Sequence, residues 1–159
     1  MLKFFSWITV ILWMLLIFYL SQQPVATSNE LSSGITERII ETVEIVAPQD
    51  NLSVDSIHHT IRKNAHFFIY FFLGIFVLIA LKRRVMKGYR KERIALYICV
   101  AYSISDEVHQ LFVSGRGAQV KDVLIDSAGA AMGILFASLI DSLVKSRARS
   151  KQLASKETV

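Results

Sequence analysis

The stretch that decides the fold is DEVHQLFVSGRGAQVKDVLIDSAGAAMG, which occupies residues 106–133. It places four carboxylates, one histidine and two basic residues within a chain that is otherwise strongly apolar. An ionisable side chain at membrane depth is costly and is kept only where it has a partner, a water-filled cavity or a function. We therefore expect the functional site of this protein to lie within or beside this stretch.

The composition around this stretch is that of an integral membrane protein. Residues of the types AVILMFWYC make up 53% of the 159 residues, they form long unbroken runs, and only two prolines occur. The single cysteine, Cys99, has no disulfide partner within the chain. The formal charge is +5, but the basic residues gather beside the apolar runs without a nucleic-acid-binding motif. We therefore expect no nucleic-acid partner.

Four apolar runs are close to the length of about 20 residues that a membrane-spanning helix needs. They predict spans over residues 4–20, 65–81, 94–113 and 120–143. A signal peptide is the competing interpretation of the first run, because Lys3 precedes it. The run is longer than the usual signal core of about 7–15 residues and contains Trp7 and Trp13, which favours a permanent anchor.

Residues 25–55, between the first two spans, are polar and acidic. Apolar residues recur there at helical spacing and the pattern ends at Pro48. This predicts a short extracytoplasmic amphipathic helix lying on the membrane or over the bundle. A surface lid without chemistry is its simplest interpretation.

The distribution of basic residues predicts the orientation. Seven of them lie between Lys82 and Arg93, where Glu92 is the only acid. Together with Lys3 and the basic residues from Lys145 onward, they bring thirteen of the eighteen basic residues to one side. By the positive-inside rule that side is cytoplasmic. The sequence thus predicts an all-α membrane domain over residues 1–145, with both termini cytoplasmic, followed by a basic cytoplasmic tail over 146–159.

The third predicted span needs polar partners in order to insert. Asp106 and Glu107 together cost roughly 5–7 kcal/mol near a helix centre, which exceeds what the apolar residues of this span return. Asp106, His109 and Gln110 share one face of a helix, whereas Glu107 lies about 100° away.

The neighbouring spans carry matching polar stripes. In the fourth span two acids and two glycines fall on one face, and the glycines form a GxxxG pattern that allows another helix to approach closely. A similar stripe in the second span combines polar residues with Gly74. These stripes are Asp122, Asp126, Gly129 and Gly133, and Lys63, His66, Tyr70 and Gly74. All three stripes reach similar depth in the outer leaflet, below a turn in which Arg116 is flanked by glycines.

Each of these residues also has a simpler interpretation. Arg62, Lys63 and Lys121 fit interfacial residues whose charged ends reach the headgroups. His66 and Tyr70 fit a packing role with an interhelical hydrogen bond, and the glycines fit packing. The buried acids favour a site. The candidate catalytic residues are Asp106, Glu107, His109 and Asp126, and the candidate ligand-binding residues are Lys63, His66, Tyr70, Asp106, Glu107, His109, Gln110, Arg116, Asp122 and Asp126.

Several short motifs occur here in a defined order. They are SQQP at 21–24, KNAH at 63–66 with Tyr70 and Gly74, and DEVHQ at 106–110 followed by Arg116, Asp122, Asp126 and Gly129. On these residues the chain resembles the VanZ-like family of bacterial membrane proteins. The resemblance implies a small multi-span fold in the bacterial cell membrane, and the founding member is associated with low-level antibiotic resistance, to teicoplanin. It implies no particular reaction.

Three functions are compatible with these features. The first is a non-enzymatic envelope protein whose outward-facing pocket binds a membrane lipid headgroup or a lipid-linked cell-wall precursor. The second is an intramembrane enzyme that acts on such a lipid, with the four candidate catalytic residues holding a divalent metal or with His109 acting as a general base. The third is a proton- or solute-coupled carrier, which four short spans without an inverted repeat make the weakest of the three. No metal-ligand spacing or nucleophile motif is recognisable, so we expect no metal and no cofactor. Formation of a homo-oligomer stays open.

Overall fold

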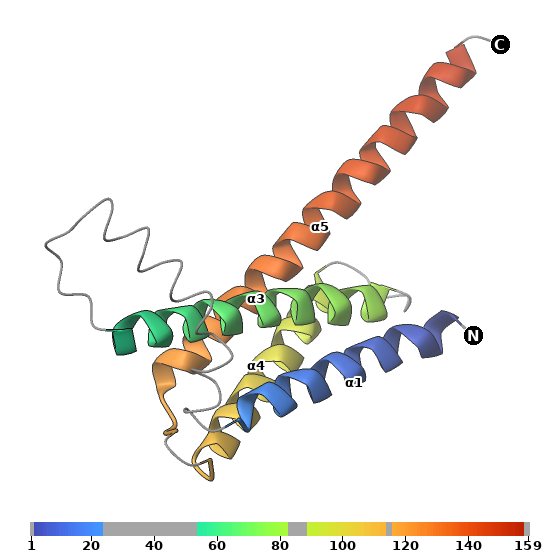
Figure 1. The fold of residues 1–159 in the computed structure, drawn as a ribbon. Coiled ribbons are helices and arrows are strands. Elements are labelled where there is room, and N and C mark those ends of the chain that lie inside the picture. Colours follow the sequence, from blue (N-terminus) through green and yellow to red (C-terminus); the bar gives the residue numbers. More distant parts are fainter. Residues whose placement is uncertain (1, 24–53, 83–88, 114–115, 158–159) are drawn as a thin grey trace, which may run out of the picture.

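The computed structural model describes residues 2–23, 54–82, 89–113 and 116–157 (Figure 1). The described part of the chain contains four helices and no strand, which confirms the all-α prediction. They are α1 (Leu2–Ser21), α3 (Val54–Lys82), α4 (Arg90–Gln110) and α5 (Val120–Glu157). The amphipathic helix predicted within residues 25–55 lies outside the described residues, except that α3 already includes the last two positions.

Two of the four predicted spans meet the length and hydropathy expected of a membrane-crossing helix. These are Lys63–Lys82 within α3 and Val120–Ser150 within α5. The prediction of four such helices is therefore wrong by this measure. The apolar part of α1, Phe5–Ser21, is shorter. Helix α4 has six charged residues among its 21, four in the first turn and the pair Asp106 and Glu107.

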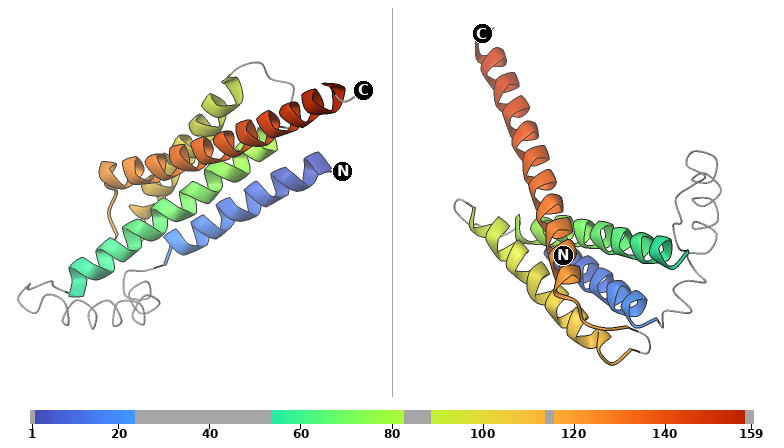
Figure 2. Two further views of the ribbon diagram at one scale, coloured as in Figure 1. Left: turned by 90° about the horizontal axis from the view of Figure 1, so that it is seen from above. Right: turned by 90° about the vertical axis from the view of Figure 1, so that its left-hand side faces the viewer.

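Helix α3 is the centre of the fold, because it packs against each of the other three helices (Figure 2). Its most extensive contact is with α5. The buried core combines Leu73, Val77 and Leu78 of α3 with residues such as Ile17 of α1 and Ile134 of α5. Beyond this core α5 continues as a single helix that projects away from the bundle (Figure 1), and residues 142–150 are all exposed.

Small residues allow α3 and α5 to approach until their backbones touch. A Cβ atom added to Gly129 would overlap the carbonyl oxygen of Phe67, and one added to Gly133 would overlap that of Phe71. The same holds for Gly74 against Ala130. The close helix approach predicted from the GxxxG pattern is therefore confirmed, and its partner is α3. This contact fixes which turns of the two helices face each other.

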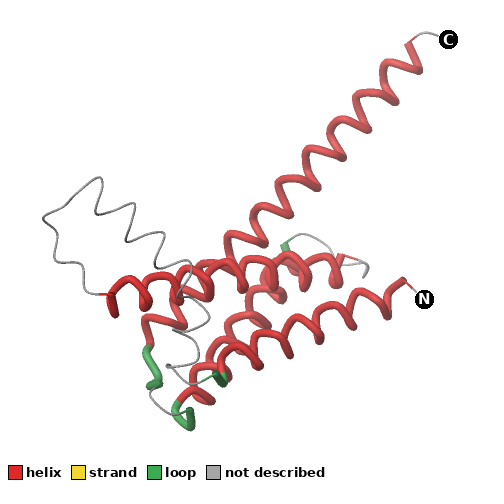
Figure 3. The backbone as a smooth tube through the Cα atoms, viewed as in Figure 1, coloured by secondary structure: helices red, strands yellow, loops and turns green. Residues whose placement is uncertain are grey.

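Side-chain hydrogen bonds to backbone carbonyls attach α1 to the bundle. The Trp13 indole Nε1 donates to the carbonyl of Ile69 at 2.9 Å, and the Tyr102 hydroxyl donates to the carbonyl of Met14. The Trp13 ring also packs edge-on against Phe76, with centroids 5.1 Å apart. These bonds hold α1 against α3 and α4, so that α1 ends beside the short loop that joins α4 to α5 (Figure 3).

We predict that Gly133→Leu destabilises the fold by about 1–3 kcal/mol or more, because the new side chain must displace the backbone of α3. The measurement is the thermal unfolding midpoint of the detergent-solubilised protein, followed by circular dichroism. Met132→Leu is the matched control, since Met132 is exposed on the adjacent position of the same helix. Equal midpoints for the two variants would contradict the close contact.

Candidate functional site

All four helices bring a polar side chain to the same end of the bundle. Ser21 is the last residue of α1, His66 lies in the N-terminal half of α3, Asp106 near the end of α4 and Asp126 near the start of α5. The two aspartates are almost completely buried, at 3% and 2% exposure. A carboxylate in such surroundings requires hydrogen bonds or a balancing charge, since its desolvation is costly.

Each buried aspartate has one oxygen that is held by a serine. The Ser21 hydroxyl donates to Asp106 Oδ2 at 2.7 Å, and the Ser103 hydroxyl donates to Asp126 Oδ2 at 3.0 Å. Both serines are fully buried. The serines thereby fix the orientation of both carboxylates. The first hydrogen bond links α1 to α4, and the second links α4 to α5.

The second oxygen of each aspartate, Oδ1, makes no hydrogen bond within the described residues. Asp126 Oδ1 lies 3.6 Å from His66 Nδ1. One ligand atom from each of His66, Asp106 and Asp126 lies within 4.8 Å of the other two. We call these three residues the buried cluster.

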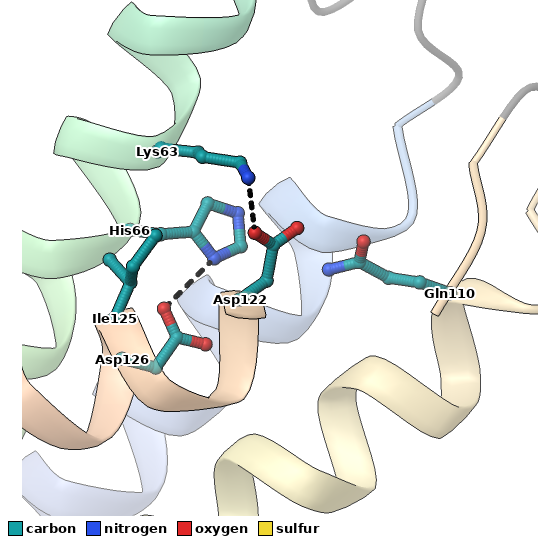
Figure 4. A pocket seen from close by; sticks show the side chains of 6 residues that line it. All are labelled: Lys63, His66, Gln110, Asp122, Ile125 and Asp126. Carbon is teal, nitrogen blue, oxygen red and sulfur yellow. Dashed lines mark ion pairs between the residues drawn. The ribbon is translucent and has the colours of Figure 1, made fainter. Parts of the chain in front are cut away.

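A small pocket, partly open to solvent, adjoins this cluster. Its lining residues come from α3, α4 and α5: Lys63, His66, Gln110, Asp122, Ile125 and Asp126 (Figure 4). Lys63 Nζ and Asp122 Oδ1 form an ion pair of 2.9 Å, with both side chains about a quarter exposed. The Gln110 amide points across the pocket toward Asp122 (Figure 4). The pocket thus combines an exposed ion pair with a buried acidic floor.

The four candidate catalytic residues do not form one group. Asp106 and Asp126 belong to the buried cluster, but Glu107 accepts a hydrogen bond from the backbone N–H of Gln119 and so holds the loop before α5. The His109 ring lies against Phe18 of α1, with centroids 4.6 Å apart. The arrangement therefore brings His66, and not His109, to the two aspartates.

Two further predicted ligand-binding residues, Tyr70 and Arg116, do not belong to the pocket lining. Tyr70 is completely buried one turn further along α3, and its ring lies 6.2 Å from that of Tyr102. Arg116 lies half-buried in the loop between α4 and α5, where its backbone N–H donates to the carbonyl of Val113 at 3.0 Å. Of the ten predicted ligand-binding residues, the structure places Lys63, His66, Gln110, Asp122 and Asp126 in the pocket wall.

The sequence interpretation overlooked the roles of Ser21 and Ser103. In the sequence, Ser21 is only the first residue of the SQQP motif at 21–24, and Ser103 lies outside the motifs. A small hydroxyl residue among apolar residues, in a chain with buried acids, is the signal that would have indicated them.

Comparison with known proteins identifies the family. The model of the VanZ/LLP1 family matches residues 5–141, which include all four helices down to the exposed part of α5. The chain belongs to this family. Searches among curated proteins and among solved structures found no match.

We predict that Ser103→Ala lowers the free energy of unfolding by about 1–2 kcal/mol, because Asp126 loses the hydrogen bond to its Oδ2 atom. Ser105→Ala, an exposed position two residues further along α4, serves as the matched control and is expected to change it by less than about 0.5 kcal/mol. Equilibrium unfolding in mixed detergent micelles gives both values. The same stability for both variants would contradict the assigned hydrogen bond.

Proposed function

We propose that this VanZ/LLP1-family protein is a multi-pass protein of the bacterial cell membrane, and that its pocket binds the phosphate-bearing headgroup of a membrane lipid or of a lipid-linked cell-wall precursor. Helices α3 and α5 then cross the membrane, and α1 and α4 pack beside them within the lipid. The exposed apolar side chains of α1 and α4 support this, since they suit contact with lipid. They include Phe5, Ile11, Leu12 and Leu15 on α1, and Tyr97, Ile104 and Val108 on α4.

The basic residues support an outward-facing pocket. Lys82, at the end of α3, and Arg90 and Arg93, at the start of α4, lie at the end of the bundle opposite to the pocket. The basic part of α5 after Lys145 projects from that end as well (Figure 1). If that end is cytoplasmic by the positive-inside rule, the pocket opens toward the outer leaflet. Lipid headgroups and the lipid carriers of cell-wall synthesis are available there.

The observation that carries the ligand proposal is that Lys63, whose side chain is 22% exposed, lines a pocket that also reaches the buried Asp126. An ammonium group at this depth would bind a phosphate oxygen by a charge-assisted hydrogen bond. Gln110 adds amide donors from the opposite wall (Figure 4). A phosphate would compete with Asp122 for Lys63. Phosphate binding would therefore replace an existing ion pair and would not require a further charged side chain to be buried.

The buried cluster supports one alternative, an intramembrane enzyme that acts on the same lipid. His66 is held 3.6 Å from Asp126 and is adjacent to the pocket, the arrangement expected of a base that is oriented by a carboxylate. In this alternative His66 takes the part that the sequence suggested for His109. Release of a lipid product during the binding experiment below would favour it.

We predict that Lys63→Gln weakens binding of a polyprenyl phosphate by roughly 10–100-fold, the loss expected for one charge-assisted hydrogen bond of about 1.5–3 kcal/mol. The measurement is native mass spectrometry of the protein in phosphatidylcholine nanodiscs that contain increasing amounts of polyprenyl phosphate. Lys121→Gln is the control. Lys121 is an exposed residue in the first turn of α5, near Asp122, and it does not line the pocket. Equal affinity of the two variants would contradict the headgroup site.

We also predict a phenotype in the intact cell, which rests on the family resemblance. Cells that lack the protein should be several-fold more susceptible to teicoplanin, and the wild-type chain, but not Lys63→Gln, should restore the original susceptibility. Minimum inhibitory concentrations of teicoplanin and vancomycin measure this. Identical values for both drugs with and without the protein would contradict a role in glycopeptide resistance.

A further inference from the structure

The pocket described above has a floor that headgroup binding does not explain. Two carboxylates from different helices lie together there with little access to water. We propose that His66, Asp106 and Asp126 bind a divalent transition-metal ion such as Zn²⁺ or Mn²⁺. Its further role, to hold a phosphate oxygen of the headgroup, rests on the proposed function, whereas the metal site itself does not.

The spacing of the buried cluster suits a shared ion better than a direct bond. The His66 Nδ1 to Asp126 Oδ1 distance of 3.6 Å is long for a hydrogen bond. Two ligands of one tetrahedral ion, with bonds of about 2.0–2.1 Å, lie roughly 3.4 Å apart. All three ligand atoms lie within 4.8 Å of one another, so small side-chain movements bring them into coordination range.

The carboxylate oxygens that make no hydrogen bond are the independent observation that points to a ligand. Asp106 and Asp126 are each at least 97% buried, and the Oδ1 atom of each makes no hydrogen bond among the described residues. Buried polar atoms are nearly always satisfied, so two such oxygens beside one histidine indicate a missing partner. In metal sites, hydrogen bonds from neighbouring residues orient the carboxylates that coordinate the ion. The hydrogen bonds from the two serines to the Oδ2 atoms would do the same here.

The ligand types select the class of ion. One imidazole and two carboxylates suit Zn²⁺ or Mn²⁺, whereas Mg²⁺ and Ca²⁺ prefer oxygen ligands alone. The ion also balances the two negative charges, which would otherwise repel each other in an apolar surrounding. Three protein ligands leave a coordination position open, as in metal sites that bind a substrate or a water molecule.

The location of the site connects the ion to the pocket. His66 and Asp126 belong both to the buried cluster and to the pocket wall. Lys63 is one helical turn from His66 on the same side of α3. A phosphate in the pocket would then meet a metal ion at the floor and an ammonium group at the entrance, and the acidic floor would no longer repel it.

The test is metal binding by the purified full chain in detergent, after treatment with a chelator and dialysis against Zn²⁺ or Mn²⁺ alone. We expect about one ion per chain by inductively coupled plasma mass spectrometry, and we expect Asp106→Asn and Asp126→Asn each to weaken Zn²⁺ binding at least tenfold in calorimetric titration. Asp122→Asn is the matched control, since Asp122 lies in the same pocket wall but outside the buried cluster. The proposal is overturned if the wild type binds no stoichiometric ion or if Asp122→Asn loses the ion equally.

A second measurement does not depend on the folding of any variant. Mn²⁺ bound to the wild-type chain should show coupling to a histidine nitrogen in pulsed electron paramagnetic resonance, and ¹⁵N-histidine labelling should change that coupling. Bound Mn²⁺ without nitrogen coupling would overturn the assignment to His66.

The experiments can contradict the metal site and the headgroup site independently of each other. If the ion binds and polyprenyl phosphate does not, with or without metal, the metal site stands and the headgroup proposal falls. If polyprenyl phosphate binds equally well after complete removal of metal, and no ion binds in its absence, the metal site falls and the headgroup proposal stands.

Discussion

The burial of two carboxylates at one junction of four helices is the constraint on which the rest of this structure depends. Asp106 and Asp126 are removed from water, and each helix supplies part of what makes this tolerable. Helix α1 contributes Ser21, α4 contributes Ser103, and α3 contributes His66. The cluster therefore sets the relative positions of the helix ends, and a helix that slid by one turn would leave a buried acid without its partner.

The glycine contact between α3 and α5 makes this junction geometrically feasible. Gly129 and Gly133 lie on the same stripe of α5 as Asp122 and Asp126, one and two turns deeper in the bundle. Because the backbones touch at the glycines, the aspartates of α5 come within reach of Lys63 and His66 on α3. The close glycine packing of α3 and α5 thus determines which polar side chains of the two helices meet one turn away.

The acids of the chain divide into separate roles that composition alone does not distinguish. Glu107 holds the loop before α5, and Asp122 pairs with Lys63 at the pocket entrance. Asp106 and Asp126 remain as a buried pair in which one oxygen of each makes no hydrogen bond within the described residues. Glu107 is also buried, but among the described acids only Asp106 and Asp126 place a carboxylate oxygen within 4.8 Å of each other and of a His66 nitrogen.

The sequence by itself determined the helical class, the apolar part of each described helix, the glycine contact and the family, because helical periodicity and apolar run length are properties of a local stretch. It did not determine the full lengths of α3 and α5, which extend to Val54 and to Glu157. It also indicated that Asp106 and Asp126 need partners, since a carboxylate among apolar residues is costly without them. Only the tertiary structure decided that His66 joins the aspartates while His109 packs against Phe18. Periodicity fixes which residues share a face of one helix, but the rotation of that helix about its axis is set by packing against its neighbours. The same packing provides the serine bonds that let the highly charged α4 belong to an otherwise apolar bundle.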